Sequence, residues 1–208
     1  GKSIVYAKGA PEVIAKLAQS DSSHLLAENL QFASQGMRVI AVAEDRGNGF
    51  RILGALGLID PPREGVKEAI ALAASAGVRT IMITGDNGLT ALHIARSVGI
   101  QTDGVIEGSA LDQMDIEELQ HALKTMSVFA RVQPAHKVKI LEALQAQGHV
   151  VAMSGDGVND APALKRAHVG VAMGEKGTDT ARDAAAIVLT DDNYATIVAA
   201  IEEGHARV

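Results

Sequence analysis

Short runs of apolar residues alternate along the chain with longer segments in which apolar residues recur at helical spacing. In the first part of the chain, the runs at residues 4–7, 38–43 and 52–59 have glycine or polar turn residues nearby, which predicts β-strands. Residues 11–19 and 24–35 have the helical spacing, with a proline opening the first segment and a glycine following the second.

The rhythm becomes regular after Asp60, where strands and helices alternate. Strands are predicted at residues 78–83, 128–130, 149–153, 169–172 and 187–189. Helices are predicted at residues 63–76, 89–98, 115–124, 134–148, 161–167, 178–185 and 193–205. Repeated strand–helix units predict an α/β fold with a parallel, doubly wound sheet. The change of rhythm places a domain boundary near residues 58–60.

Composition narrows the possible functions. Apolar residues make up 47% of the 208 residues, which is enough for a core, and aromatic residues only 2%, so aliphatic side chains must fill it. A net charge of -6 argues against a broad nucleic-acid surface and a polybasic membrane anchor. The lack of cysteine excludes disulfides and thiolate metal sites. No apolar stretch approaches the roughly 20 residues that span a bilayer, so we expect a soluble domain.

A glycine-rich motif at residues 154–162 carries the strongest candidate chemistry. Asp156 and Asp160 flank a turn in which Gly155 and Gly157 let the backbone approach a ligand closely. Mg²⁺ prefers one or two carboxylates together with phosphate and water oxygens. The motif therefore indicates a Mg²⁺ site, and the alternative is a turn followed by an Asp or Asn helix cap.

Two further motifs follow predicted strands. Thr84 and Gly85 offer a hydroxyl and exposed backbone N–H groups before a helix, which is typical of an anion site or of an ordinary threonine cap. Lys137 lies one turn into a helix, where an isolated lysine is usually solvated. Because the carboxyl ends of parallel strands meet at one edge, we expect Thr84, Lys137, Asp156 and Asn159 to converge on one pocket.

Together these motifs resemble the phosphorylation domain of P-type cation-transporting ATPases, most closely the type II group of calcium and sodium pumps. The matching segments are MITGDN, FARVQPAHK and GDGVNDAPAL, together with residues 8–12, 60–63 and 191–193. The resemblance covers essentially the whole chain. It implies a haloacid-dehalogenase-like Rossmannoid domain at residues 59–208, preceded by the C-terminal part of a nucleotide-binding domain at residues 1–58.

The resemblance also implies a role for individual residues. Thr84 and Gly85 would bind the transferred phosphoryl group, Lys137 would neutralise its developing charge, and Asn159 would donate a hydrogen bond to its oxygens. Asp156 would ligate Mg²⁺, with Asp160 supporting the metal site.

The same resemblance implies nucleotide contacts. Lys8 would lie against the adenine of ATP, Arg38 would reach the phosphates, and Arg63 would lie near the ribose. Asp86 and Arg131 would also contact the nucleotide. For an isolated arginine, a surface salt bridge is the alternative.

The family's nucleophile is an aspartate in an Asp-Lys-Thr-Gly-Thr motif, and this sequence contains no such motif. In the family it lies upstream, on the central strand of the sheet. We therefore expect the chain to be part of a larger protein and to form no phosphoenzyme by itself. Without the central strand, its exposed edges could favour a dimer.

The leading interpretation is the ATP- and Mg²⁺-binding portion of an ATP-driven cation pump. Its partners would be the missing strand, an actuator domain and transmembrane helices, and it would lie at the cytosolic face of a membrane. The alternatives are a non-catalytic nucleotide- and Mg²⁺-binding regulatory module and a stand-alone phosphatase of the same fold. The seven histidines lack metal-site spacing, and His136 is interpreted as a helix-surface residue.

Overall fold

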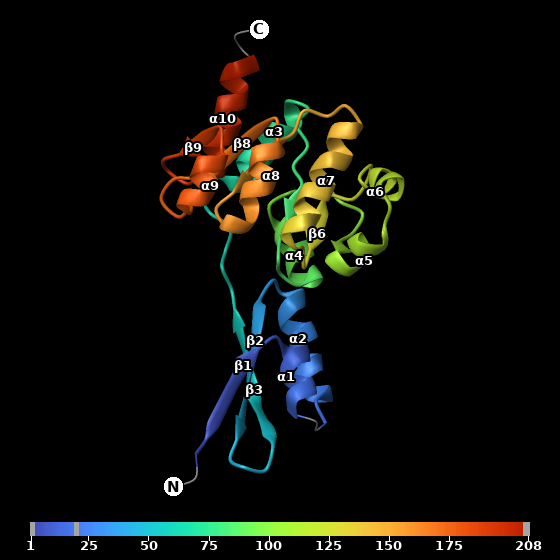
Figure 1. Ribbon diagram of the computed structural model, residues 1–208, viewed down its shortest axis with the longest axis vertical. Helices are drawn as coiled ribbons and strands as arrows, with labels where there is room; N and C mark the ends of the chain where they lie inside the picture. Colours follow the sequence, from blue (N-terminus) through green and yellow to red (C-terminus); the bar gives the residue numbers. More distant parts are fainter. Residues whose placement is uncertain (1–2, 19–20, 206–208) are drawn as a thin grey trace. The chain divides into compact units, whose positions relative to one another are not determined.

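A computed structural model describes residues 3–18 and 21–205 (Figure 1). The chain divides into two compact units. The first comprises Gly1–Pro62 and Leu89–Ile94, and the second comprises Arg63–Gly88 and Ala95–Val208. Each unit is described by itself.

The first unit is an antiparallel sheet with helices on one face. Its strands, in the order β1-β2-β3, are β1 (Val5–Gly9), β2 (Arg38–Asp45) and β3 (Phe50–Leu58). The helices α1 (Pro11–Ala18) and α2 (Ser23–Ser34) cover one face of this sheet (Figure 1). The core on that side consists of buried apolar side chains from both helices and from β2: Ile14, Leu25, Ala41 and Ala43. All five predicted elements are confirmed, although the predicted helix end at Gln19 lies outside the described residues.

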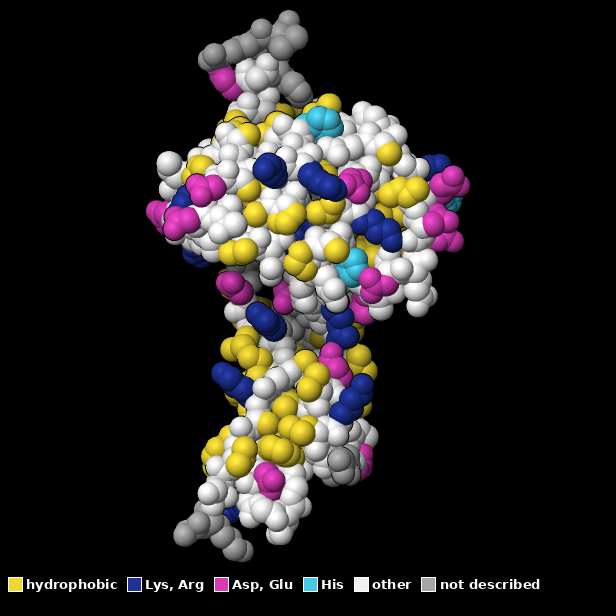
Figure 2. Space-filling view, in the orientation of Figure 1, with side chains coloured by type: hydrophobic (Ala, Val, Ile, Leu, Met, Phe, Trp, Pro, Cys, Tyr) yellow, Lys and Arg dark blue, Asp and Glu magenta, His cyan; other side chains and the backbone are white. Residues whose placement is uncertain are grey.

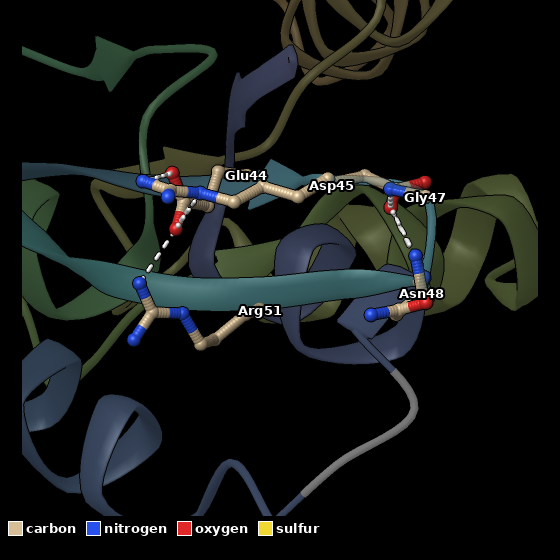
Figure 3. A network of polar contacts seen from close by, with 7 residues as sticks. Glu44, Asp45, Gly47, Asn48 and Arg51 are labelled. Atoms are coloured by element: carbon tan, nitrogen blue, oxygen red, sulfur yellow. Dashed lines mark hydrogen bonds and ion pairs between the residues drawn. The ribbon is translucent and has the colours of Figure 1, made fainter. Parts of the chain in front are cut away.

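Charged side chains organise the turn between β2 and β3 (Figure 3). One carboxylate oxygen of Asp45 accepts hydrogen bonds from the backbone N–H groups of Gly47, Asn48 and Gly49, at 2.7, 3.1 and 3.0 Å. The adjacent Glu44 is buried and accepts a hydrogen bond of 2.5 Å from Arg51. This bond, together with one from the Arg46 guanidinium, lowers the pKa of Glu44.

The second unit contains two parallel sheets of three strands each. One has the order β4-β6-β5, from β4 (Met82–Ile83), β6 (Val128–Ala130) and β5 (Ile106–Glu107). The other has the order β7-β8-β9, from β7 (Ala152–Gly155), β8 (Val169–Met173) and β9 (Ile187–Leu189). Among the described residues, β4 pairs only with β6 and β7 only with β8. The parallel α/β class is confirmed. The prediction of one continuous sheet is wrong, because the described strands form two separate parallel sheets.

The helices that accompany these strands are mostly short. They are α3 (Val66–Ser75), α5 (Gly108–Gln113), α6 (Ile116–Ala122), α7 (Pro134–Ala146), α8 (Ala161–Arg166), α9 (Asp179–Ala184) and α10 (Tyr194–His205), with a 3-10 turn η1 (Val158–Asp160). Helix α4 (Gly88–Ser97) is divided, since its residues Leu89–Ile94 belong to the first unit. Phe129 of β6 is fully buried among Leu111, Leu119, Leu123 and Ile140, so α5, α6 and α7 pack against this strand. No helix in the described ranges is long and apolar enough to cross a membrane.

Two predicted strands have the wrong extent. The strand predicted at 78–83 contracts to Met82–Ile83, because its partner β6 has only three residues and pairs with these two alone. The strand predicted at 149–153 instead begins at Ala152, since the N–H of Val151 donates to His168 Nδ1 at 3.1 Å rather than to a neighbouring strand. The short elements β5 and α5 were not predicted.

Candidate functional site

Asp160 is the centre of the loop that follows β7. It is 5% exposed, and its Oδ2 accepts hydrogen bonds from the backbone N–H groups of Asp156 at 3.2 Å and Gly157 at 3.0 Å. The carboxylate of η1 therefore folds the glycine-rich loop around itself. Asp160 therefore stabilises the conformation of the loop, because its Oδ2 already accepts two hydrogen bonds from the protein's own backbone.

Gly155 allows this close fold. A Cβ at position 155 would lie 2.5 Å from the Cβ of Asp160 and 2.6 Å from its Cγ, distances that no side chain tolerates. The glycine is required because the loop returns over its own strand end. The first half of the motif is thus explained by packing against Asp160.

Lys137 approaches the same carboxylate from α7. Its Nζ forms a short ion pair with Asp160 Oδ1, and the two side chains are 19% and 7% exposed. Lys137 is in the first turn of α7, which begins at Pro134 directly after the β6–α7 turn. The start of α7 therefore holds the Lys137 ammonium beside the 156–160 loop.

Asp156 and Asn159 lie on the exposed side of this loop. The backbone O of Asp156 accepts a hydrogen bond of 2.8 Å from Thr178 N, which attaches the loop to the start of α9. Within the described residues, the Asp156 carboxylate has no hydrogen-bond or ion-pair partner. Those residues contain no cluster of three or more metal-ligating side chains, but Mg²⁺ needs only one or two carboxylates beside phosphate and water oxygens.

Thr84 belongs to a tight turn at the end of β4. The backbone N–H of Asp86 donates to Thr84 Oγ1 at 3.1 Å, and the hydroxyl lies 3.2 Å from Asp86 Oδ2. The turn contacts the end of β6, because Arg131 N donates to Asp86 O at 2.9 Å and Val132 N donates to Thr84 O at 3.1 Å. Gly85 lies exposed at the tip of this turn.

The motifs are therefore in direct contact at two places. The 84–86 turn touches residues 131–132, and Lys137 touches the 156–160 loop. The 84–86 and 156–160 segments belong to strands of different sheets, β4 and β7, that do not pair with each other. Convergence of all four phosphoryl-site residues on one pocket stays a prediction.

Lys8 and Arg38 share one face of the first unit's sheet. Lys8 pairs with Val42, and Arg38 lies on the same side of β2 as Val42 because side chains alternate along a strand. The buried Ala41 points to the opposite face, which the helices cover. Both side chains are exposed. Arg38 and Val42, the partner of Lys8, are four residues apart on β2, which corresponds to about 13 Å along the strand. The uncovered face also bears exposed Leu56, and Figure 2 shows hydrophobic side chains gathered over this unit.

Arg63 and Asp192 form a contact that the sequence reasoning did not predict. The Arg63 guanidinium donates to the backbone O of Asp192, which has a left-handed φ of 51°. The carboxylate of Asp192 is buried and accepts from Glu175 N at 3.0 Å and Lys176 N at 2.8 Å. Burial alone would raise the pKa of Asp192, but these backbone hydrogen bonds outweigh it and lower the pKa.

His136 corrects another prediction. Its ring is not on the helix surface: it is 5% exposed and hydrogen-bonded at both nitrogens. The Nδ1 accepts from Gln133 N, three residues earlier, and this Gln-x-x-His spacing before a helix was the available signal. The physical reason for burial is the packing of α5, an element that was not predicted, against the start of α7.

Comparison with known proteins finds relatives over most of the chain. A family model described as haloacid dehalogenase-like hydrolase matches residues 3–168. The chain is 42% identical over 98% of its length to "Calcium-transporting ATPase" of Bacillus subtilis (strain 168), of which it covers 26%. It is 48% identical over 85% of its length to "Calcium-transporting ATPase 1" of Schizosaccharomyces pombe, covering 21% of that protein.

A human protein gives a similar match. The chain is 43% identical over 97% of its length to "Calcium-transporting ATPase type 2C member 1" of Homo sapiens and covers 24% of it. The chain thus spans about a quarter of the length of these relatives. The names of these relatives agree with the resemblance to P-type cation-transporting ATPases that the motifs carry.

Proposed function

The chain belongs to the haloacid dehalogenase-like hydrolases, and from this premise we propose that it is the Mg²⁺- and phosphoryl-binding portion of an ATP-driven calcium pump. The names of the relatives support the transport of calcium. The observation that carries the proposal is the ion pair between Lys137 and Asp160, which places a cation beside the loop that exposes Asp156 and Asn159.

The residues present fit a magnesium ion. The exposed Asp156 carboxylate supplies oxygens without a partner among the described residues, and carboxylate oxygens are the ligands that Mg²⁺ prefers. Asp156 would hold the metal. Asp160 would act mainly by fixing the loop and Lys137. When bound, Mg²⁺ would supply positive charge to the phosphoryl oxygens.

The chain's own residues would then bind and orient the phosphoryl group. Lys137 would offset negative charge on its oxygens, and Asn159 and the Thr84–Gly85 turn would donate hydrogen bonds to them. Lys8 and Arg38, which share one open face of the first unit's sheet, would contact the nucleotide. Asp86 and Arg131 are proposed as further nucleotide contacts. Arg63 already donates to Asp192, so we propose that it reaches the ribose only by leaving or sharing that contact.

The phosphorylated aspartate would come from another part of a longer protein. The edges of β4 and β7 support this, because each strand has a partner on one side only among the described residues. A strand that ends in Asp-Lys-Thr-Gly-Thr and lies between them would bring its aspartate to the carboxyl ends of both sheets. Alternatively, these edges would make the isolated chain dimerise.

Calorimetric titration of the 208-residue chain with ATP, with and without Mg²⁺, tests the proposal. We expect Mg²⁺-dependent ATP binding that weakens in Lys8→Ala and Lys137→Ala. Labelled ATP followed by acid quench should leave no label on the chain, since the nucleophile is not in its sequence. Absence of ATP and Mg²⁺ binding would contradict the proposal, whereas phosphate release without any partner would favour a stand-alone phosphatase.

A further inference from the structure

His136 is a buried titratable group that the proposed function does not use. It immediately precedes Lys137 in the first turn of α7 and is 5% exposed. Its Nδ1 lies 3.1 Å from the backbone N of Gln133, and its Nε2 lies 2.7 Å from Asp112 Oδ1. One ring therefore connects the β6–α7 turn, the first turn of α7 and α5.

The hydrogen bonds fix the tautomer of this ring. A backbone N–H can only donate, so Nδ1 must present its lone pair to Gln133. The ring proton of the neutral imidazole is then on Nε2, from which it is donated to the carboxylate of Asp112. Asp112 thus selects the form of His136 that can cap the helix.

Close packing holds the ring in place. A Cβ at Gly108 would lie 3.1 Å from both Cε1 and Nδ1 of His136, and 2.3 Å from the backbone O of Arg131. The start of α5 therefore presses directly on the ring and on the turn before α7. Because Arg131 in that turn has a left-handed φ of 49°, the turn adopts a conformation that its neighbours must hold.

We infer that His136, oriented by Asp112, is a positioning residue for Lys137. The inference rests on the proposed function, in which Lys137 binds the phosphoryl group. His136 fixes the backbone of the helical turn from which Lys137 extends, and so fixes where the lysine ammonium meets the 156–160 loop. It acts through the helix turn: its ring contacts are made with Gln133, Asp112 and Gly108.

Substitutions at both ends of the His136–Asp112 hydrogen bond remove it while an acceptor for Gln133 N is kept. His136→Asn places an acceptor near the Nδ1 position and loses the bond to Asp112. Asp112→Ala removes the acceptor of Nε2, and Asp112→Asn restores an acceptor without the charge. Asp112 is 63% exposed at its side chain, so its variants should fold.

Lys139→Met is the matched control. Lys139 joins the same two helices, since its Nζ donates to the backbone O of Leu111 and of Met114 at 2.5 Å each. Among the described residues, its side-chain hydrogen bonds involve neither His136 nor the turn before α7. A loss of α5–α7 packing alone would therefore appear in Lys139→Met as well.

The readout is the affinity of the 208-residue chain for inorganic phosphate at saturating Mg²⁺. We expect His136→Asn and Asp112→Ala to weaken phosphate binding about three- to tenfold, a range typical of one lost hydrogen bond. Asp112→Asn and Lys139→Met should bind like the wild type. Equal affinity in all variants, or an equal loss in Lys139→Met, would overturn the inference.

Nuclear magnetic resonance keeps the test independent of the proposed function. If the wild type binds no phosphate, the proposed function fails, and the ¹⁵Nζ signal of Lys137 in its ion pair with Asp160 decides the inference. That signal should shift in His136→Asn and Asp112→Ala but not in Lys139→Met. An unchanged signal in the first two variants, or the neutral wild-type ring carrying its proton on Nδ1, would overturn the positioning role.

Discussion

Asp160 binds Lys137 through one carboxylate oxygen and the backbone of the 156–157 segment through the other. A single buried side chain thereby joins α7 to the loop after β7. The loop's exposed carboxylate, Asp156, is left to face solvent. The two aspartates of the glycine-rich motif therefore differ in role, and substitutions can separate them.

Asp160→Asn should destabilise the second unit. The change leaves the Lys137 ammonium, which is 19% exposed at its side chain, without its carboxylate. We expect the free energy of unfolding to fall by about 2 kcal/mol, because a largely buried charge loses its partner. Urea unfolding measures this. A change below about 0.5 kcal/mol, the range of ordinary surface substitutions, would show that the ion pair does not hold the loop.

Asp156→Asn should act on the metal and not on the fold. The side chain has no partner in the described part of the chain, so the free energy of unfolding should change by less than about 0.5 kcal/mol. Mg²⁺ affinity, measured by calorimetry, should fall about tenfold or more, since a carboxylate ligand is lost. Asp183→Asn, at an exposed position of α9, is the control and should leave both quantities unchanged.

Gly155→Ala should destabilise the loop by steric overlap. The added Cβ would lie 2.5 Å from Asp160 Cβ, and we expect a loss of about 1–3 kcal/mol in the free energy of unfolding. Gly85→Ala is the matched control, because a Cβ there meets no atom within 4 Å. Similar stability of the two variants in thermal unfolding would refute the packing explanation for Gly155.

Local pattern predicted much of this arrangement and missed what depends on distant contacts. Strand 128–130 was predicted correctly in extent, because it is a short apolar run followed by turn residues. The burial of His136 depends on Asp112 and Gly108, more than twenty positions away, and no local periodicity reports such a contact.

The split of the parallel strands into two sheets was equally hidden from the pattern. Hydrophobic runs predict that strands exist, but they do not say which strand lies beside which. The length of β4 was overestimated for a related reason: an apolar run does not report how long its partner is, and β6 pairs only with Met82 and Ile83. Roles of individual site residues depend on ligands, which sequence pattern alone does not supply.

Acid should weaken the second unit through Asp192. Its pKa is lowered in the folded protein, so the stabilisation by its carboxylate is fully present above the unfolded pKa of about 4 and is lost as the pH falls through the lower, folded value. Asp192→Asn keeps a residue that tolerates the left-handed φ of 51° but removes this charge.

The free energy of unfolding of the wild type and of Asp192→Asn, measured across the acid pH range, checks this prediction. The wild type should lose stability relative to Asp192→Asn as the pH falls below about 4, and the difference should be constant above about pH 5. Parallel stability curves over the acid range would mean that the hydrogen bonds from Glu175 and Lys176 do not favour the charged carboxylate.

The free edges of β4 and β7 should accept a strand. A peptide with an apolar strand followed by Asp-Lys-Thr-Gly-Thr should bind the 208-residue chain, because backbone pairing on both sides satisfies its N–H and C=O groups. Hydrogen exchange should then slow at the amides of Met82–Ile83 and Ala152–Gly155. A peptide with proline inside the strand is the control, since proline cannot donate to the ladder. Binding that the proline does not weaken, or binding without slower exchange at both strands, would place the peptide elsewhere and leave the origin of the nucleophile strand unexplained.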